Sequence, residues 1–391
     1  MEATGAAQHG LAERAGAAYD ALLRHFAVAD GASLFRENAA PVQERPYAYL
    51  WPFTWALIAT LDLSGVPVEL QGGRQLHTAV AERLVGLSRY WDSRHQAYAS
   101  YVVPPLGQGG DRYFDDNAWV GLALVELHRL RGATVVDRGA GALHRLRQLI
   151  RPSAPAMVLD RARTVHEWAQ RGWGTADRPP VAGGLPWVDA AWNRDRGSGA
   201  SAGHAELGLQ LAELTGDASL LGTAQTGGAM RLYTWVETNL RDPADGLYWD
   251  KFLGDGGLDR TKWSYNQAVM LGASALLFRA TGEQGYLEHG RAIARAVLDG
   301  MDLARQPASF NCMLCRNLLL LASVQDADQA RRYREPLQSY ADWAWETVRD
   351  PATTLFVFDG AGAPVTLLDQ AAMVQINALL AWDAQDWRKL A

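Results

Sequence analysis

Cysteine is scarce in this sequence of 391 residues. The only two, Cys312 and Cys315, exclude a disulfide framework. They lie in an apolar segment typical of a helix. A redox CxxC motif is expected near a βαβ pattern, and a zinc site would need two further ligands. We therefore expect two buried free thiols.

Charge and long apolar runs are also scarce. Charged residues make up 20% of the chain and the net charge is −6, which provides no positive field for a polyanion. Nucleic acid is therefore not an expected partner. No uncharged apolar run reaches the roughly 18 residues that a membrane span needs, so no membrane partner is expected either.

Signals for metals, phosphates and export are missing as well. The histidines show no HxH or HExxH spacing, and the Gly-rich segment 106–112 fits neither GxGxxG nor a P-loop. We expect no metal and no cofactor. Residues 1–30 lack a basic start, an apolar run and a small-residue cleavage site, so the protein as written is expected in the cytoplasm. It would be secreted only if an export signal lies outside this sequence.

Two adjacent aspartates, Asp115 and Asp116, are the most informative feature that the sequence does contain. The apolar run after them, Ala118 to Val125, predicts a buried helix with both carboxylates at its rim. A helix cap beside the positive end of the helix dipole would explain one Asp, but two neighbouring carboxylates repel each other. Such a pair can divide into a charged and a protonated group, as in glycosidases. From this motif alone, capping, catalysis and Mg²⁺ ligation remain open.

Sparsely charged and amphipathic helical segments alternate along the chain. Helix stops are predicted at Gly132, Gly216 and Gly282. Six inner and six outer helices predict an all-α fold, an (α/α)6 barrel or six-hairpin toroid. We expect one domain over 1–391 with an insertion at 133–155, and short loop hairpins at 247–252 and 355–358. The inner segments are Trp51–Leu61, Asn117–Val125, Ser198–Leu211, Ser264–Phe278, Asn317–Val324 and Gln370–Trp382, and the outer ones lie near Leu11–Val28, Gln75–Tyr90, Met157–Arg171, Thr223–Leu240, Gln284–Leu298 and Ala327–Val348.

In such a barrel the inner helices run parallel, so their N-terminal ends share one face. Aromatic residues stand beside Asp, Asn or Gln at most of these starts, which suits a sugar: flat faces for the ring, amides and carboxylates for its hydroxyls. The structural alternative is that Asn and Asp are good caps and Trp is usually buried. His204 is the one histidine expected near the rim. The candidate substrate-binding residues are Trp51, Tyr113, Asn117, Trp119, Asn193, Asp195, Tyr265, Asn266, Gln267 and Asp369.

Four stretches of the sequence carry a family resemblance. The most specific is Asp-Asp-Asn-Ala-Trp at 115–119, and the others lie at 187–194, 261–267 and 367–375. Together they resemble glycoside hydrolase family 76, the α-1,6-mannanases, in a bacterial, actinobacterial-like form. The resemblance runs from about Trp51 to Trp382 and implies an (α/α)6 barrel, in agreement with the helix pattern.

The resemblance also implies a mechanism. It predicts a retaining (endo-)α-1,6-mannanase or mannosidase, with Asp115 as nucleophile, Asp116 as general acid/base and an α-mannoside oligosaccharide or polysaccharide as substrate. Retention needs two carboxyls about 5–5.5 Å apart. The helix dipole is expected to keep Asp115 ionised, and the charge of Asp115 to keep Asp116 protonated. Two alternatives are a sugar epimerase or isomerase on the same barrel, with His204 as base, and a noncatalytic carbohydrate-binding protein.

Overall fold

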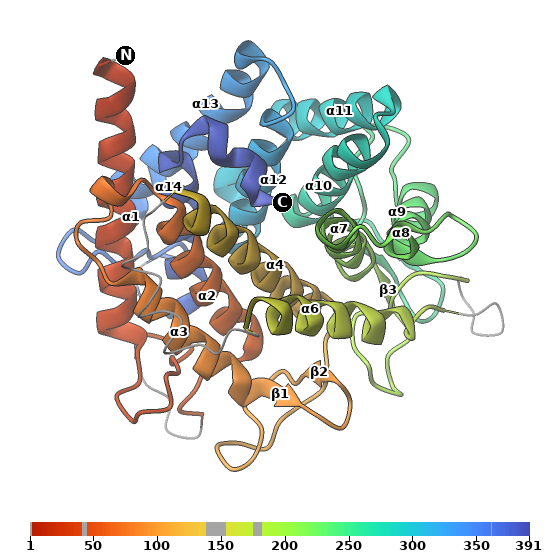
Figure 1. Ribbon diagram of the computed structural model, residues 1–391, viewed down its shortest axis with the longest axis horizontal. Helices are drawn as coiled ribbons and strands as arrows, with labels where there is room; N and C mark the ends of the chain where they lie inside the picture. The colour runs from red at the N-terminus through yellow and green to blue at the C-terminus, as the bar shows by residue number, and fades with distance from the viewer. Residues whose placement is uncertain (1, 41–44, 138–153, 175–181, 361) are drawn as a thin grey trace. The chain divides into compact units, whose positions relative to one another are not determined.

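The structure is a computed structural model that describes residues 2–40, 45–137, 154–174, 182–360 and 362–391. Most of these residues are helical (Figure 1). Contacts divide the chain into two compact units. Unit 1 comprises Met1–Trp91, Ala99–Gly110 and Gly300–Leu390, and unit 2 comprises Asp92–Tyr98 and Asp111–Asp299 with Ala391. The single domain expected over 1–391 stays a prediction.

Unit 1 contains three helices that are buried nearly all round, α2, α12 and α14, and three amphipathic ones, α1, α3 and α13. The centre of its core is α14, which packs against α1, α2 and α12. This burial follows from composition, because α14 carries a single charged residue, Asp369, in its first turn. The helices of unit 1 are α1 (Glu2–Phe26), α2 (Leu50–Gly65), η1 (Val68–Leu70), α3 (Leu76–Leu87), η2 (Ser88–Tyr90), η3 (Leu303–Arg305), α12 (Ala308–Ala322), α13 (Ala327–Trp343), the π-helix η4 (Ala344–Val348), α14 (Leu367–Ala381) and η5 (Ala384–Leu390).

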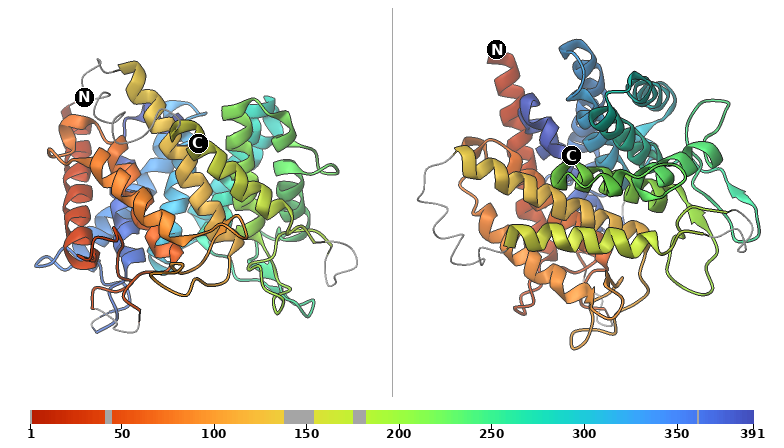
Figure 2. Two further views of the ribbon diagram at one scale, coloured as in Figure 1. Left: turned by 60° about the horizontal axis from the view of Figure 1, so that its bottom comes forward. Right: turned by 45° about the vertical axis from the view of Figure 1, so that its right-hand side comes forward.

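Unit 2 repeats this composition, with α4, α7 and α10 buried and α6, α9 and α11 amphipathic. Its central helix is α7, which packs against α4, α9 and α10 (Figure 1 and Figure 2). The helices of unit 2 are α4 (Phe114–Asp137), α6 (Ala154–Gln170), α7 (Ser198–Thr215), α8 (Ala218–Leu221), α9 (Gly228–Asn239), α10 (Ser264–Thr281) and α11 (Gln284–Gly300).

The strands are two residues long. One sheet pairs β1 (Trp91–Asp92) with β2 (Ala97–Tyr98). The other is antiparallel with the order β3 (Arg196–Gly197), β4 (Lys251–Phe252), β5 (Leu258–Asp259), and places Arg196 opposite Phe252. The predicted loop hairpin at 247–252 thus contributes a strand, whereas 355–358 forms only a single bridge, between Phe356 and Arg349.

The helix pattern predicted from the sequence is confirmed, with two differences. The fifth inner helix begins at Ala308 rather than Asn317, directly after Pro307. Gly216 and Gly282 end their helices in the left-handed conformation, at φ 69° and 73°. Gly132 does not, because α4 continues to Asp137; glycine inside a helix costs only about 1 kcal/mol.

Two other predictions concern the insertion and the thiols. Residues 138–153 of the predicted insertion at 133–155 lie outside the described residues, while its two ends belong to α4 and α6. Cys312 and Cys315 are buried free thiols, as predicted. None of the helices described is long and apolar enough to cross a membrane.

Candidate active site

Asp115 and Asp116 lie in the first turn of α4 and are half-buried. One oxygen of Asp115, Oδ1, accepts the backbone N–H of Asp116 at 2.9 Å. The following residues, from Asn117 to Val120, are buried. The aspartates therefore stand where a buried helix reaches its rim, and Asp115 satisfies one of the free N–H groups of the first turn.

The residue before the dyad, Phe114, is fixed by three contacts within unit 2. Its ring stacks on Trp168 with centroids 4.3 Å apart, and its N–H donates to the carbonyl of Trp187 at 2.9 Å. Its carbonyl lies 2.9 Å from Nε2 of His204. Because the carbonyl of Phe114 belongs to the peptide that joins it to Asp115, these contacts set the position of the dyad.

Asp115 is surrounded by groups that disfavour its charge. Burial raises the pKa of its carboxyl from the usual 3.8 to about 7, and the negative charge of Asp250 adds to the rise. The N–H groups of the helix start and the ammonium of Lys251 act against it. The helix start favours the ionised form of Asp115, as expected, but desolvation outweighs the dipole and the amide donors.

Asp250 is a functional candidate that the sequence analysis missed. Its Oδ1 accepts hydrogen bonds from the hydroxyl of Tyr265 at 2.6 Å and from Nδ2 of Asn266 at 3.1 Å. Burial, and then the charge of Asp250, raises the pKa of Tyr265 well above its ordinary value, so this phenol remains a donor. Two predicted site residues, Tyr265 and Asn266, thus meet at a third carboxylate that influences Asp115. Asp250 lies in a loop, and a search confined to helix starts could not find it.

Tyr265 reaches Asp250 because its ring packs closely against Gly199. A Cβ on Gly199 would lie 2.5 Å from the ring of Tyr265, so glycine at the start of α7 makes room for it. Asn266 also donates to Oγ of Ser198 at 2.7 Å and accepts the N–H of Trp263 at 2.9 Å. With every polar group of its amide engaged, Asn266 holds Asp250 rather than a ligand.

Asn117 and Gln267 serve as clamps for the backbone of buried aromatic residues. The amide of Asn117 binds the N–H and carbonyl of Tyr98 at 2.8 and 3.0 Å, and the amide of Gln267 binds those of Tyr248 at 2.7 and 2.9 Å. Both amides are fully buried. The expectation that they contact substrate is therefore wrong. Buried peptide groups need partners, and these side chains supply them.

Unit 1 contains the same device. Gln370 in α14 accepts the N–H of Phe356 at 3.2 Å and donates to the carbonyl of Thr354 at 3.2 Å. Asp369, beside it, lies in the first turn of α14: its N–H donates to the hydroxyl of the N-cap Thr366, its carboxylate accepts from that hydroxyl, and burial raises its pKa. Trp51, also of unit 1, stacks on Phe310 with centroids 5.9 Å apart. Asp369 is thus explained by its hydrogen bonds to the cap Thr366, and Trp51 by packing within its own unit.

The other predicted residues divide between core and loop. Trp119 is 5% exposed and packs against Gly203, so it belongs to the core and its predicted contact with substrate is wrong. Asn193 braces its loop through Val188 and the N–H of Asp195, at 3.3 and 3.2 Å. Asp195 accepts the N–H of Gly254 at 2.9 Å and lies 3.4 Å from Nζ of Lys251. Tyr113 is half-buried, with its ring 5.2 Å from that of Trp187.

His204 is not at the rim. It is fully buried, and burial with the nearby His166 lowers its pKa to about 3, so the ring is neutral. A neutral ring donates from Nε2 to the carbonyl of Phe114. The predicted role as an accessible base, on which the epimerase alternative depended, is therefore wrong.

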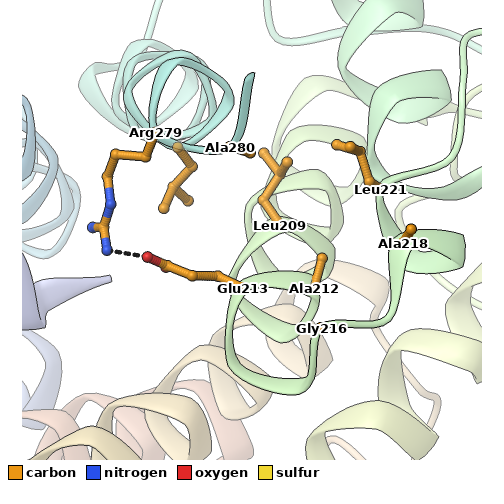
Figure 3. Close-up of a pocket in the computed structure, with 9 residues that line it drawn as sticks. Leu209, Ala212, Glu213, Gly216, Ala218, Leu221, Arg279 and Ala280 are labelled. Carbon is orange, nitrogen blue, oxygen red and sulfur yellow. Dashed lines mark hydrogen bonds and ion pairs between the residues drawn. The ribbon is translucent and has the colours of Figure 1, made fainter. Parts of the chain in front are cut away.

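A cavity of about 220 Å³ lies elsewhere in unit 2 (Figure 3). It uses the C-terminal ends of α7 and α10, roughly 20 Å along each helix from the end near Asp250. Glu213 pairs there with Arg279, and also with Arg129 at 2.9 Å. The charged residues of this cavity are therefore paired with one another. Because the cavity lies at the C-terminal ends of α7 and α10, it is not the site of the dyad. Across the described ranges, no three His, Cys, Asp or Glu side chains are grouped as metal ligands would be.

Comparison with solved structures shows the fold. A family 76 mannosidase from Bacteroides thetaiotaomicron VPI-5482 is 22% identical, covers 95% of this chain and 98% of its own, and has a TM-score of 0.78. The α-1,6-mannanase of Salegentibacter sp. HEL1_6 is 19% identical over 95% of this chain and 99% of its own, with a TM-score of 0.70. These similarities confirm the predicted all-α class and the (α/α)6 barrel.

Comparison of sequences identifies the family. No curated protein matches this chain. The family model for glycosyl hydrolase family 76 matches residues 150–384, more than half of the chain, and the dyad precedes that range. The chain therefore belongs to glycosyl hydrolase family 76.

Proposed function

We propose that this protein is a retaining α-1,6-mannanase in which Asp115 is the nucleophile and Asp116 the general acid/base. The observation that carries the proposal is the half-buried pair at the start of α4, with the pKa of Asp115 raised to about 7. Perturbed carboxyls at a helix mouth are typical of catalytic sites. Membership of family 76 supplies the class of reaction.

The solved relatives support the choice of residues and substrate. Inactive variants of the Salegentibacter α-1,6-mannanase carry substitutions at two consecutive aspartates and were crystallised with α-1,6-mannotriose and α-1,6-mannotetrose. Asp115 and Asp116 are the only consecutive aspartates in the present sequence. An α-1,6-linked mannoside is accordingly the substrate that we propose.

The reaction follows from the two carboxyls. An oxygen of ionised Asp115 forms a bond to the anomeric carbon while the glycosidic bond breaks, and Asp116 gives its proton to the leaving oxygen. A water then attacks the anomeric carbon, loses its proton to Asp116 and displaces Asp115, which restores both residues and retains the configuration. Positive charge on the sugar in the transition state stabilises the Asp115 carboxylate that burial disfavours.

Asp250 and Tyr265 adjust this chemistry. The charge of Asp250 raises the pKa of Asp115, and the hydroxyl of Tyr265 fixes that charge in place at 2.6 Å. Free enzyme therefore holds Asp115 partly protonated near neutral pH. Only the ionised fraction can attack, so activity should rise with pH up to about 7.

The test is a product profile on linear α-1,6-mannan, with the anomer of the first product assigned by NMR. An initial α product supports retention, and an initial β product contradicts it. Asp115→Asn should lower kcat by about 1,000-fold or more, whereas Asp255→Asn, an exposed carboxylate in the same unit, should not. Mannan binding without any product from the wild type would favour a noncatalytic binding protein. Asp116→Asn should spare substrates with good leaving groups, because they need no proton.

A further inference from the structure

Two tryptophans beside the dyad are exposed to solvent. Trp192 is 66% exposed and Trp187 is 37% exposed, and they are the two tryptophans among the exposed large apolar side chains of the described residues. Tryptophan is usually well buried, because leaving its ring in water is unfavourable. Exposed aromatic residues that lie together are more often a binding surface than a chance of composition.

The loop that carries them is braced, so the exposure belongs to the folded structure. The carbonyl of Trp187 accepts the N–H of Phe114, and Val188 bridges Tyr113. Asn193 ties the loop across Trp192 through its bonds to Val188 and Asp195. The exposed position of Trp192 is thus fixed by the hydrogen bonds of its own loop.

The rings form a corner. Those of Trp187 and Trp192 lie 6.4 Å apart with an angle of 80° between their planes, and Tyr113 meets Trp187 at 65°. Nζ of Lys251 lies 5.1 Å from the centre of the Trp187 ring and 3.4 Å from Asp195. The corner therefore offers a flat apolar face with a donor and an acceptor at its edge.

We propose that Trp192 and Trp187, with Lys251 and Asp195 at the edge, bind a further hexose ring of the glycan next to the one that is cut. A pyranose ring has a C–H face that stacks on an aromatic ring, and hydroxyls that reach groups such as Lys251 and Asp195. Phe114, whose N–H binds the carbonyl of Trp187, is also the residue before Asp115, so the corner adjoins the dyad.

The area favours a small occupant. Two tryptophan side chains provide at most about 500 Å² even when fully exposed. A stable protein interface needs roughly 800 Å² from each partner. A sugar ring fits the smaller area, and a second copy of the chain does not. The proposal rests on the proposed function, since it assigns this corner to the same glycan.

The experiment compares Trp192→Ala with the wild type on an aryl α-mannoside and on α-1,6-linked oligosaccharides of increasing length. We expect kcat/KM to fall about five- to tenfold for the longer chains and to stay unchanged for the aryl mannoside. Trp192→Phe should recover part of the loss. Met157→Ala, which removes another side chain of unit 2 that is 61% exposed, should behave as the wild type at every length.

Wild-type activity separates the two proposals. If the wild type cuts α-mannosides and Trp192→Ala shows an unchanged dependence on length, or an equal loss at all lengths, the subsite is refuted and the mannanase function stands. If the wild type cuts a different hexose oligosaccharide, the mannanase function fails, and the length series on that substrate decides the subsite. If the wild type forms an oligomer that Trp192→Ala dissociates, the corner serves self-association and the subsite is refuted. The absence of any glycan binding would also refute the subsite.

Discussion

Replacing Asp250 by asparagine should move the pH dependence of catalysis. Asn keeps an oxygen that can accept hydrogen bonds from Tyr265 and Asn266. It removes the negative charge of Asp250, and that charge raises the pKa of Asp115 in the wild type. In the wild type the rise from 3.8 to about 7 corresponds to about 4 kcal/mol against ionisation. Because burial is the larger cause, we expect Asp250→Asn to remove a minor part of this rise and to leave the pKa well above 3.8.

The assay is kcat/KM for an aryl α-mannoside from pH 4 to pH 9. A nucleophile with a pKa of about 7 is roughly 1% ionised at pH 5, so wild-type kcat/KM should be about 100-fold below its plateau there. In Asp250→Asn the acidic limb should lie at lower pH, and kcat/KM at pH 5 should fall below its plateau by a several-fold smaller factor than in the wild type. The position of the limb is the readout, since the height of the plateau also reports any contact of Asp250 with substrate.

Asp255→Asn is the matched control, because it removes an exposed carboxylate five positions along the chain. Its limb should coincide with that of the wild type. An acidic limb that does not move in Asp250→Asn would refute the coupling of Asp250 to Asp115. An alkaline limb near pH 7 that moves in Asp250→Asn would reverse the roles, because Asp115 would then act in its protonated form.

Three further predictions concern stability and positioning. The raised pKa of Asp115 contributes stability that is present below pH 4 and is lost as pH rises through 7. Asp115→Asn should therefore exceed the wild type in free energy of unfolding at pH 8, by about 1–2 kcal/mol of the full 4, and should not exceed it at pH 4. An equal difference in Tm at both pH values would contradict this. Gln267→Leu leaves the N–H and carbonyl of Tyr248 without their partner, so it should lower the free energy of unfolding, measured in urea, by about 2–4 kcal/mol. The control Gln284→Leu, at an exposed position, should lower it by under about 0.5 kcal/mol. His204→Leu removes the donor to the carbonyl of Phe114 and should lower kcat by a larger factor than it raises KM. His204→Gln should restore part of kcat. If it does not, His204 is a packing residue only.

The fold was predictable because its signals are local and repeated. A helix that is apolar all round must be buried, and this holds for α2, α7, α10 and α14 without knowledge of their neighbours. Gly216 and Gly282 marked their helix ends for a similar reason, since few other residues adopt positive φ. Gly132 was misread because nothing in the sequence distinguishes a glycine that ends a helix from one that the helix tolerates.

The candidate site was predictable only in part. A rule that searches helix starts finds Asp115, Asp116 and Tyr265, but it also finds Asn117 and Gln267, which hold backbone instead of substrate. Amides suit both tasks equally, so their identity does not reveal which one they perform. Asp250 escaped the rule because its position depends on the pairing of β4 with β3, a contact between segments that are distant in sequence.

The clamps and the dyad are connected by one physical requirement. A carboxyl whose pKa lies near neutral must be held at a depth where the cost of burying its charge exceeds the stabilisation from the helix dipole and the amide donors. Nearer to solvent, Asp115 would be fully ionised at pH 7, and deeper in the protein it would be fully protonated. Asn117, next to the pair, fixes the first turn of α4 to the carbonyl of Tyr113 and the backbone of Tyr98, and so fixes that depth. Buried amides that never touch a sugar can thus be as necessary to the reaction as the carboxylates that they position.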